Sequence, residues 1–139
     1  MLHITRSTAL VAAATLALGL GAGFALGQAQ VPTKTVGQSE EALRSMNLAD
    51  EMDGVQGRPL RMRKLTLAPG GVLGLHNHVG RPAVGYFLQG EVTYHVEGKP
   101  DTVLRPGDSF AEGRATTHWA ENRGTVPAVW IAVDIPTKP

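Results

Sequence analysis

Glycine and proline interrupt this chain at short intervals, and that punctuation limits the folds open to it. All nine prolines and all but four of the 17 glycines lie from Pro32 onward. Between them lie short apolar or alternating runs, such as Val92, Tyr94 and Val96 with polar residues in between. Helix interiors tolerate glycine and proline poorly, whereas short strands between turn residues are typical of sandwiches and barrels. We therefore expect an all-β sandwich or barrel, because no long amphipathic helix supports an α/β fold.

The N-terminal segment differs from the rest of the chain. Arg6 is the last charged residue before Lys34, and the run from Thr8 to Leu26 between them is mostly Ala, Leu, Val and Gly. A basic start, an apolar run and small residues at its end are typical of a signal peptide. The run is also just long enough to span a bilayer as an uncleaved anchor. We predict a signal peptide or membrane anchor over residues 1–29, and hence a periplasmic or secreted protein that contacts the membrane only if this segment is retained.

Residues 30–57 are predicted to form a linker that contains one short helix. Ser39 would cap the helix, with Glu40 and Glu41 in its first turn. Its apolar face would consist of Ala42, Leu43 and Met46. The folded domain would then occupy residues 58–139.

Composition excludes several classes of function. The chain has 13 basic and 12 acidic residues, and the basic residues form no stripe, so we expect no nucleic-acid partner. It has no cysteine, which excludes disulfides, thiolate metal ligands and a cysteine nucleophile. A hydrophobic content of 42% is too high for a disordered chain.

Three histidines give the clearest functional signal. His76 and His78 are two residues apart, a spacing that places both imidazoles on one face of a strand. His118 follows in a separate predicted strand and could supply a third ligand to a shared metal ion. Imidazole nitrogen is accepted by Fe, Mn, Ni, Cu and Zn. The alternative is that His76 and His78 are ordinary polar residues of a solvated strand.

The residues around these histidines resemble the two motifs of the cupin superfamily. Gly70 precedes His76 by five intervening residues, and Gly90 fits the glycine that closes the first motif. The second motif begins at Gly107 and includes His118 and, after three further residues, Asn122. The chain is thus identified as a small single-domain cupin of type 2, with the resemblance covering about residues 58–135 and the cupin domain expected over 58–139. The resemblance implies a double-stranded β-helix, an RmlC-like jelly roll, with a pocket inside the barrel, and makes a homodimer plausible.

One position departs from the family pattern. Ala83 stands where the first motif has a glutamate, so the usual fourth protein ligand is missing. Glu112 shares strand parity with His118 and is our candidate for an extra ligand or proton acceptor. The alternative is an exposed carboxylate at a strand end. If Ala83 faces inward, Phe87 and Gln89 share its face by parity and become pocket candidates, as does Asn122 from the second motif.

Two classes of function follow from this pattern. The resemblance to three-histidine cupins implies a metal-dependent enzyme of dioxygenase type, acting on a small organic substrate. The missing glutamate favours instead a non-catalytic periplasmic cupin that binds a small molecule or a metal. A metal-free barrel that uses the histidines as bases or hydrogen-bond groups is a third interpretation. Arg81 could meet an anionic ligand at the barrel mouth, although solvated loop arginines are the commoner case.

Overall fold

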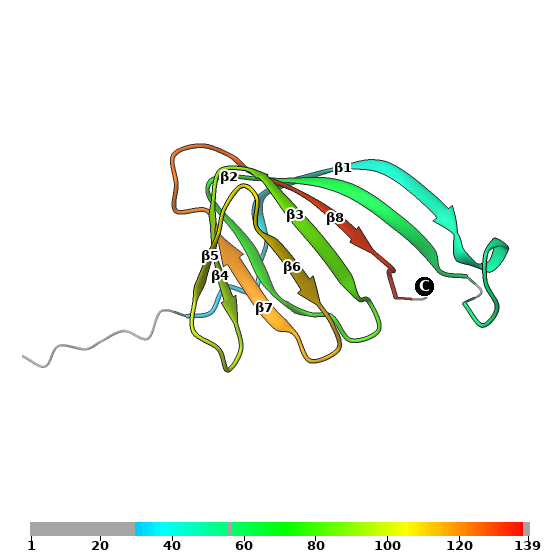
Figure 1. Cartoon of the computed structure of the whole chain (residues 1–139). Coiled ribbons are helices and arrows are strands. Elements are labelled where there is room, and N and C mark those ends of the chain that lie inside the picture. Colours follow the sequence, from blue (N-terminus) through cyan, green and yellow to red (C-terminus); the bar gives the residue numbers. More distant parts are fainter. Residues whose placement is uncertain (1–29, 56, 138–139) are drawn as a thin grey trace, which may run out of the picture.

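The computed structural model describes residues 30–55 and 57–137, which form a nearly closed barrel with the jelly-roll arrangement (Figure 1). One eight-stranded sheet runs in the order β5-β4-β7-β2-β8-β3-β6, and β1 pairs with β2. The elements are β1 (Val36–Asn47), η1 (Leu48–Asp50), β2 (Pro59–Asn77), β3 (Ala83–Gln89), β4 (Val92–Val96), β5 (Thr102–Leu104), β6 (Ser109–Glu112), β7 (Thr117–Glu121) and β8 (Ala128–Asp134).

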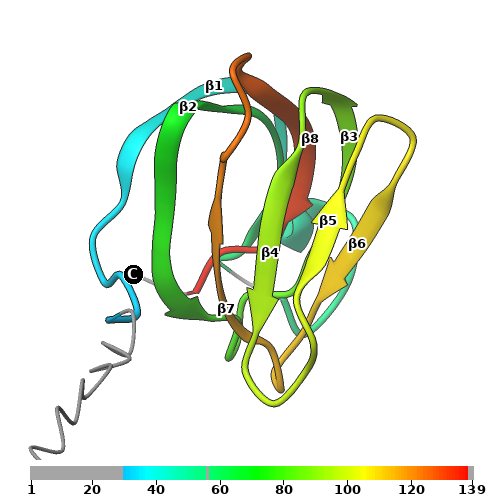
Figure 2. The same cartoon turned by 90° about the vertical axis from the view of Figure 1, so that its left-hand side faces the viewer.

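The long strand β2 connects the two halves of the barrel. Its first half, Arg61 to Leu67, pairs with β8, and its second half, Val72 to Asn77, pairs with β7. Gly70 lies between these halves with a φ of 71°, a conformation that residues with a Cβ rarely adopt. One strand therefore contributes to both walls of the barrel, as the curved green ribbon in Figure 2 shows.

Apolar side chains fill the barrel interior. Phe87 stacks on Trp130 with ring centroids 5.4 Å apart, and Phe110 meets Phe87 edge-on at 6.0 Å. Along β8 every second residue is buried, as expected for a strand with one face toward a core. The buried cluster consists of Leu65, Leu67, Phe87, Val92, Leu104, Ala120, Ala128, Trp130 and Ala132.

The helix and linker predicted before residue 58 are wrong for residues 36–47. These residues form β1, which pairs with β2 from Val36 opposite Val72 to Asn47 opposite Pro59. The acids that suggested a helix N-terminus instead contact β2, where Glu40 pairs with Arg63 at 2.6 Å and Glu41 pairs with Lys64. The strand is favoured over the helix because it satisfies the backbone hydrogen bonds of an edge that β2 would otherwise leave open.

The predicted signal or anchor segment, residues 1–29, lies outside the described residues. Within residues 30–55 and 57–137, no helix is long and apolar enough to cross a membrane.

A buried ion cluster joins β2 to β8 beside the barrel end. The Asp134 side chain is fully buried and accepts two hydrogen bonds from Arg61, at 2.9 and 2.8 Å, and one from Arg63 at 3.0 Å. Burial alone would raise the pKa of Asp134, but the hydrogen bond from Arg61 and the charges of Arg63, Arg61 and Arg81 outweigh it, so the net shift is downward. The ionised carboxylate is therefore the form that the fold favours.

The variant Asp134→Asn should lower the free energy of unfolding by about 3 kcal/mol at pH 7, because two arginines lose a buried partner. The pKa of Asp134 is lower in the folded protein than in the unfolded chain, where it is 3.8. The ionised carboxylate therefore stabilises the fold fully when the pH is above 3.8, and this contribution is lost as the pH falls through the folded pKa. The difference between wild type and variant should therefore shrink toward strongly acidic pH. Urea unfolding at pH 7 and at strongly acidic pH checks this, with Asp53→Asn in an exposed loop as the control variant. Equal stability of Asp134→Asn and Asp53→Asn at pH 7 would contradict the account.

Candidate metal centre

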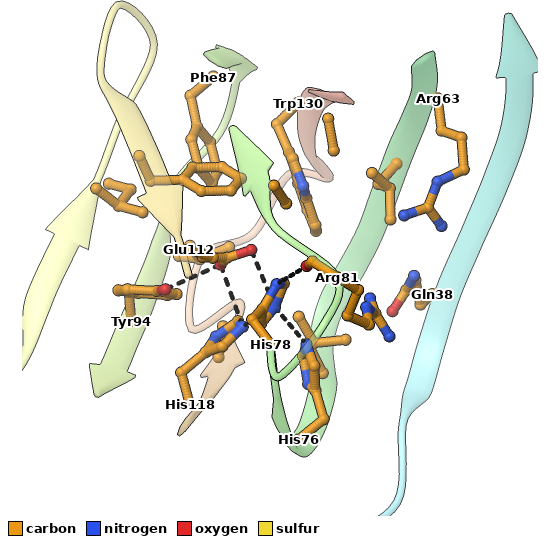
Figure 3. Close-up of a pocket in the computed structure, with 18 residues that line it drawn as sticks. Gln38, Arg63, His76, His78, Arg81, Phe87, Tyr94, Glu112, His118 and Trp130 are labelled. Atoms are coloured by element: carbon orange, nitrogen blue, oxygen red, sulfur yellow. Dashed lines mark hydrogen bonds and ion pairs between the residues drawn. The ribbon is translucent and has the colours of Figure 1, made fainter. Parts of the chain in front are cut away.

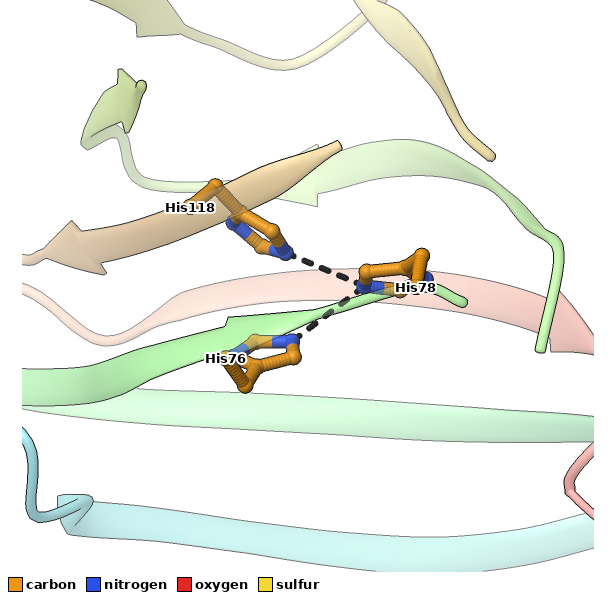
Figure 4. Close-up of side chains that lie close together, drawn as sticks. All are labelled: His76, His78 and His118. Carbon is orange, nitrogen blue, oxygen red and sulfur yellow. Dashed lines mark hydrogen bonds between the residues drawn. The ribbon is translucent and has the colours of Figure 1, made fainter. Parts of the chain in front are cut away.

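The structure brings the three predicted histidines together. His76 on β2 lies directly opposite His118 on β7, and His78 follows just after the end of β2. Its Nε2 atom lies 3.2 Å from Nε2 of His76 and 3.1 Å from Nε2 of His118 (Figure 4). The ligand atoms of all three side chains lie within 4.8 Å of one another, and His78 and His118 are buried. The alternative of a solvated strand, considered for His76 and His78, is wrong for His78, which is buried, while His76 is partly buried.

Backbone carbonyls fix which nitrogen carries the proton. Nδ1 of His76 lies 2.9 Å from the Gly74 carbonyl oxygen, and Nδ1 of His78 lies 3.1 Å from that of Arg81. A carbonyl can only accept, so both Nδ1 atoms are donors and both Nε2 atoms carry lone pairs. Two lone pairs that face each other form no hydrogen bond.

The spacing of these atoms fits a metal ion. Two ligands bound at about 2.1 Å and at a right angle to each other lie about 3.0 Å apart. The observed Nε2 separations of 3.2 and 3.1 Å agree with that value. The three histidines therefore fit a first-row divalent metal, and the chemistry of the donors does not decide among Fe, Mn, Ni, Cu and Zn.

Burial keeps the imidazoles in the form that binds metals. It lowers the pKa of His78 to about 4 and that of His118 to about 3, and it lowers the pKa of His76 as well. The nearby Arg81 charge acts in the same direction on all three. At neutral pH the histidines are thus uncharged, with lone pairs available.

Glu112 at the end of β6 points into the same cluster. Its Oε2 lies 3.1 Å from Nε2 of His78, and its Oε1 lies 3.1 Å from Nε2 of His118. Tyr94 donates a hydrogen bond of 2.9 Å to Oε1. Burial raises the pKa of Glu112 to about 7, against the opposing effects of Tyr94 and Arg81. The exposed carboxylate considered as the alternative is wrong, since this residue is buried.

A cavity of about 90 Å³ lies beside the histidines (Figure 3). Phe87, Phe110 and Trp130 form its apolar wall, while Glu112 and Tyr94 lie with the histidines at its polar end. A second group of polar side chains lines it from β1, β2 and the β2–β3 turn: Gln38, Arg63 and Arg81. The cavity therefore has an apolar wall and two polar ends.

Two of the three pocket candidates are placed elsewhere. Phe87 lines the cavity, but Gln89 is exposed and its amide donates to the Pro127 carbonyl oxygen at 3.3 Å. The pairing of β3 with β8 shifts register between Phe87 and Gln89. A bulge of this kind resets the alternation of side chains, so the parity argument for Gln89 is wrong.

Asn122 is buried but does not line the cavity. Its amide nitrogen donates to the carbonyl oxygens of Leu67, at 2.9 Å, and Val126, at 2.8 Å, while its Oδ1 accepts from the Gly124 backbone at 2.9 Å. The side chain thus holds the β7–β8 connection against β2. Its placement in the pocket by motif was wrong, and its role in the fold is structural.

Several cavity residues were not assigned to the site from sequence, among them Tyr94, Gln38 and Arg81. Tyr94 shares the strand face of Val92 and Val96, with polar residues between them, and this pattern already indicated an inward side chain. Gln38 was not recognised as a cavity residue because its segment was predicted to be a linker. Arg81 was considered a solvated loop charge, yet its Nε is buried without a hydrogen-bond partner among the described residues.

The fold and the site define a small jelly-roll protein with a cluster of three histidines that could hold a metal ion. The family model for the cupin domain matches residues 63–134, so the chain belongs to the cupin family. An oxalate-binding protein of Thermotoga maritima is 35% identical over 72 residues, which cover 52% of this chain and 59% of that protein. An auxin-binding protein of Prunus persica is 29% identical over 85 residues, covering 58% of this chain and 41% of that one. The chain thus spans about half the length of these relatives.

Solved structures agree with this fold. KdgF from Halomonas sp. superposes with a TM-score of 0.58 at 22% identity, over 73% of this chain and 81% of that one. A protein described as a predicted oxalate decarboxylase, from Thermotoga maritima, gives 0.57 at 23% identity, over 76% and 93%. At these identities the likeness concerns the fold alone.

The variant Asn122→Ala should lower the free energy of unfolding by about 1–3 kcal/mol, because buried carbonyl oxygens lose their donor. Metal content should stay at the wild-type level, since the side chain does not face the cavity. Denaturant unfolding and elemental analysis of the same preparation separate the two effects. Loss of metal with unchanged stability would show instead that Asn122 belongs to the site.

Proposed function

We propose that this protein binds a divalent transition metal through His76, His78 and His118 and takes a small carboxylate anion, of the oxalate type, into the adjoining cavity. The observation that carries the proposal is the convergence of the Nε2 atoms, two of which have lone pairs fixed by backbone carbonyls. Such an arrangement of acceptors is stable around a cation and repulsive without one.

The charge of the site favours an anionic ligand. Three neutral imidazoles remove none of the double charge of a bound metal ion, so the site stays positive even with an ionised Glu112 beside it. Arg81 also lines the cavity and forms no ion pair with the described residues, whereas Arg63 is paired with Glu40 and Asp134. A carboxylate can accept paired hydrogen bonds from a free guanidinium.

The size of the cavity limits the ligand to a few heavy atoms. Its volume of about 90 Å³ is smaller than the roughly 150 Å³ of a cavity known to accommodate benzene. The oxalate-binding relative supports a ligand of this size and charge. In this proposal the ligand's oxygen atoms approach the metal, while Arg81 orients the carboxylate and the aromatic wall excludes water.

An oxygen-dependent reaction of dioxygenase type on the bound anion is the second candidate. Three protein ligands leave further positions on the metal available, next to a cavity that admits an organic anion. Iron-loaded protein that consumes oxygen with oxalate would favour this candidate, and tight binding without turnover would favour a binding protein. We also propose export to the periplasm or beyond, on the composition of residues 1–29.

Protein purified without a histidine tag should contain about one equivalent of a transition metal, by elemental mass spectrometry. The double variant His76→Ala/His118→Ala should contain none, because one remaining histidine cannot hold the ion. His95→Ala is the matched control, since His95 stacks on Trp119 and contacts Asp101 and Glu121 outside the cluster. A wild-type protein that stays metal-free after reconstitution with each of Fe, Mn, Ni, Cu and Zn would refute the proposal.

The variant Arg81→Gln should weaken oxalate binding to the metal-loaded protein by about 10- to 100-fold, the usual worth of a charge-assisted pair of hydrogen bonds. Metal content should not change, because the Arg81 group that hydrogen-bonds to His78 is its backbone carbonyl, which the variant keeps. Isothermal titration with oxalate measures the effect, with Arg44→Gln on the exposed face of β1 as control. Equal affinity of Arg81→Gln and wild type would remove Arg81 from the ligand site.

A further inference from the structure

The chain lacks the usual glutamate at the start of β3, but a carboxylate stands directly across from that position. Ala83 is the first residue of β3, is buried, and lines the cavity. In the pairing of β3 with β6, its partner is Glu112. Directly paired residues of antiparallel strands project from the same face, with Cβ atoms about 5 Å apart. A side chain on β6 can therefore reach the space that a longer side chain on β3 would reach.

The Glu112 carboxylate lies where a ligand would lie. Each of its oxygens is 3.1 Å from one histidine nitrogen, Oε2 from His78 and Oε1 from His118. Those two nitrogens are themselves 3.1 Å apart. The three groups thus have the mutual spacing of neighbouring ligands around one ion, about 3 Å.

Only a protonated Glu112 could donate a hydrogen bond to Nε2 of His78; the ionised carboxylate, the form that binds a metal ion, cannot. The proton of this imidazole is on Nδ1, where the Arg81 carbonyl accepts it, so its Nε2 has no hydrogen to offer. An ionised Glu112 also offers only lone pairs. Two acceptors at 3.1 Å are brought together favourably by a cation between them.

We propose that Glu112 is the fourth protein ligand of the metal. In this chain β6 would then supply the carboxylate that the family motif places on the neighbouring strand β3. This inference rests on the proposed metal site. Tyr94 would act as a positioning residue, because its hydroxyl donates to Oε1 and holds the carboxylate toward the histidines. Ala83 leaves the space that Glu112 needs. The anionic ligand would lower the net charge of the metal site by one.

The experiment measures Zn²⁺ affinity by competition with a chelating dye, and the visible spectrum of the Co²⁺-loaded protein. Glu112→Gln keeps the shape of the side chain and should lower Zn²⁺ affinity by about 10- to 100-fold. It should also change the Co²⁺ spectrum, which reports on the ligand set. Glu97→Gln, an exposed residue at the end of β4, is the matched control and should match wild type.

A swap variant tests the relocation itself. Ala83→Glu/Glu112→Ala returns the carboxylate to β3, and it should bind Zn²⁺ more tightly than Glu112→Ala alone. Circular dichroism confirms that each variant is folded before it is titrated.

The outcomes distinguish this inference from the proposed function. A wild-type protein that binds neither Zn²⁺ nor Co²⁺ would refute both. Wild type that binds both ions, with unchanged affinity and spectrum in Glu112→Gln, would refute only the role of Glu112. A loss in Glu112→Ala that the swap does not recover at all would also overturn the transfer of the ligand between strands.

Discussion

The antiparallel register between β2 and β7 is the constraint on which the candidate site depends. It places His76 opposite His118, and the backbone carbonyls of Gly74 and Arg81 then hold the protons of His76 and His78 away from the centre. A slip of one residue would turn the paired side chains to the outer face. The continuous strand β2 secures the register, because its other half is paired along seven positions with β8. The geometry of the histidine cluster is thus a consequence of how the two halves of the barrel are joined.

Electrostatics divides the barrel interior into an apolar part and a polar part. The aromatic stack of Phe87 and Trp130 fills one side of the cavity, while buried polar groups gather on the other. Each buried group has a different means of compensation: Asp134 is held by arginines, and Tyr94 donates to Glu112. Three groups keep a buried nitrogen without a hydrogen-bond partner among the described residues: His118 at Nδ1, and Arg63 and Arg81 at Nε. The proposed metal ion and anion would supply charges that compensate these groups.

The sequence predicted the all-β fold from the spacing of turn residues, and the histidine cluster from the spacing of His76 and His78 together with the resemblance to the two cupin motifs. Strand parity also placed Glu112 on the face of His118. The parity argument failed for Gln89, because the pairing of β3 with β8 shifts register before it and reverses the alternation. No residue in the sequence indicates this shift. The segment with Glu40 and Glu41 satisfies the local rules for a helix start, but β2 offers long-range hydrogen bonds and basic partners that those rules do not include. Asn122 was misplaced because a motif position records neither the side chain's direction nor its backbone partners. Contacts between segments that are distant in the sequence therefore explain each error.

Anomalous diffraction from crystals grown with a single added transition metal tests the central claim most directly. The account predicts one strong peak inside the barrel, at about 2.0–2.2 Å from the Nε2 atoms of His76, His78 and His118. A peak only at surface groups such as His95 and Asp101, or none at all, would contradict a metal centre built by the β2–β7 register.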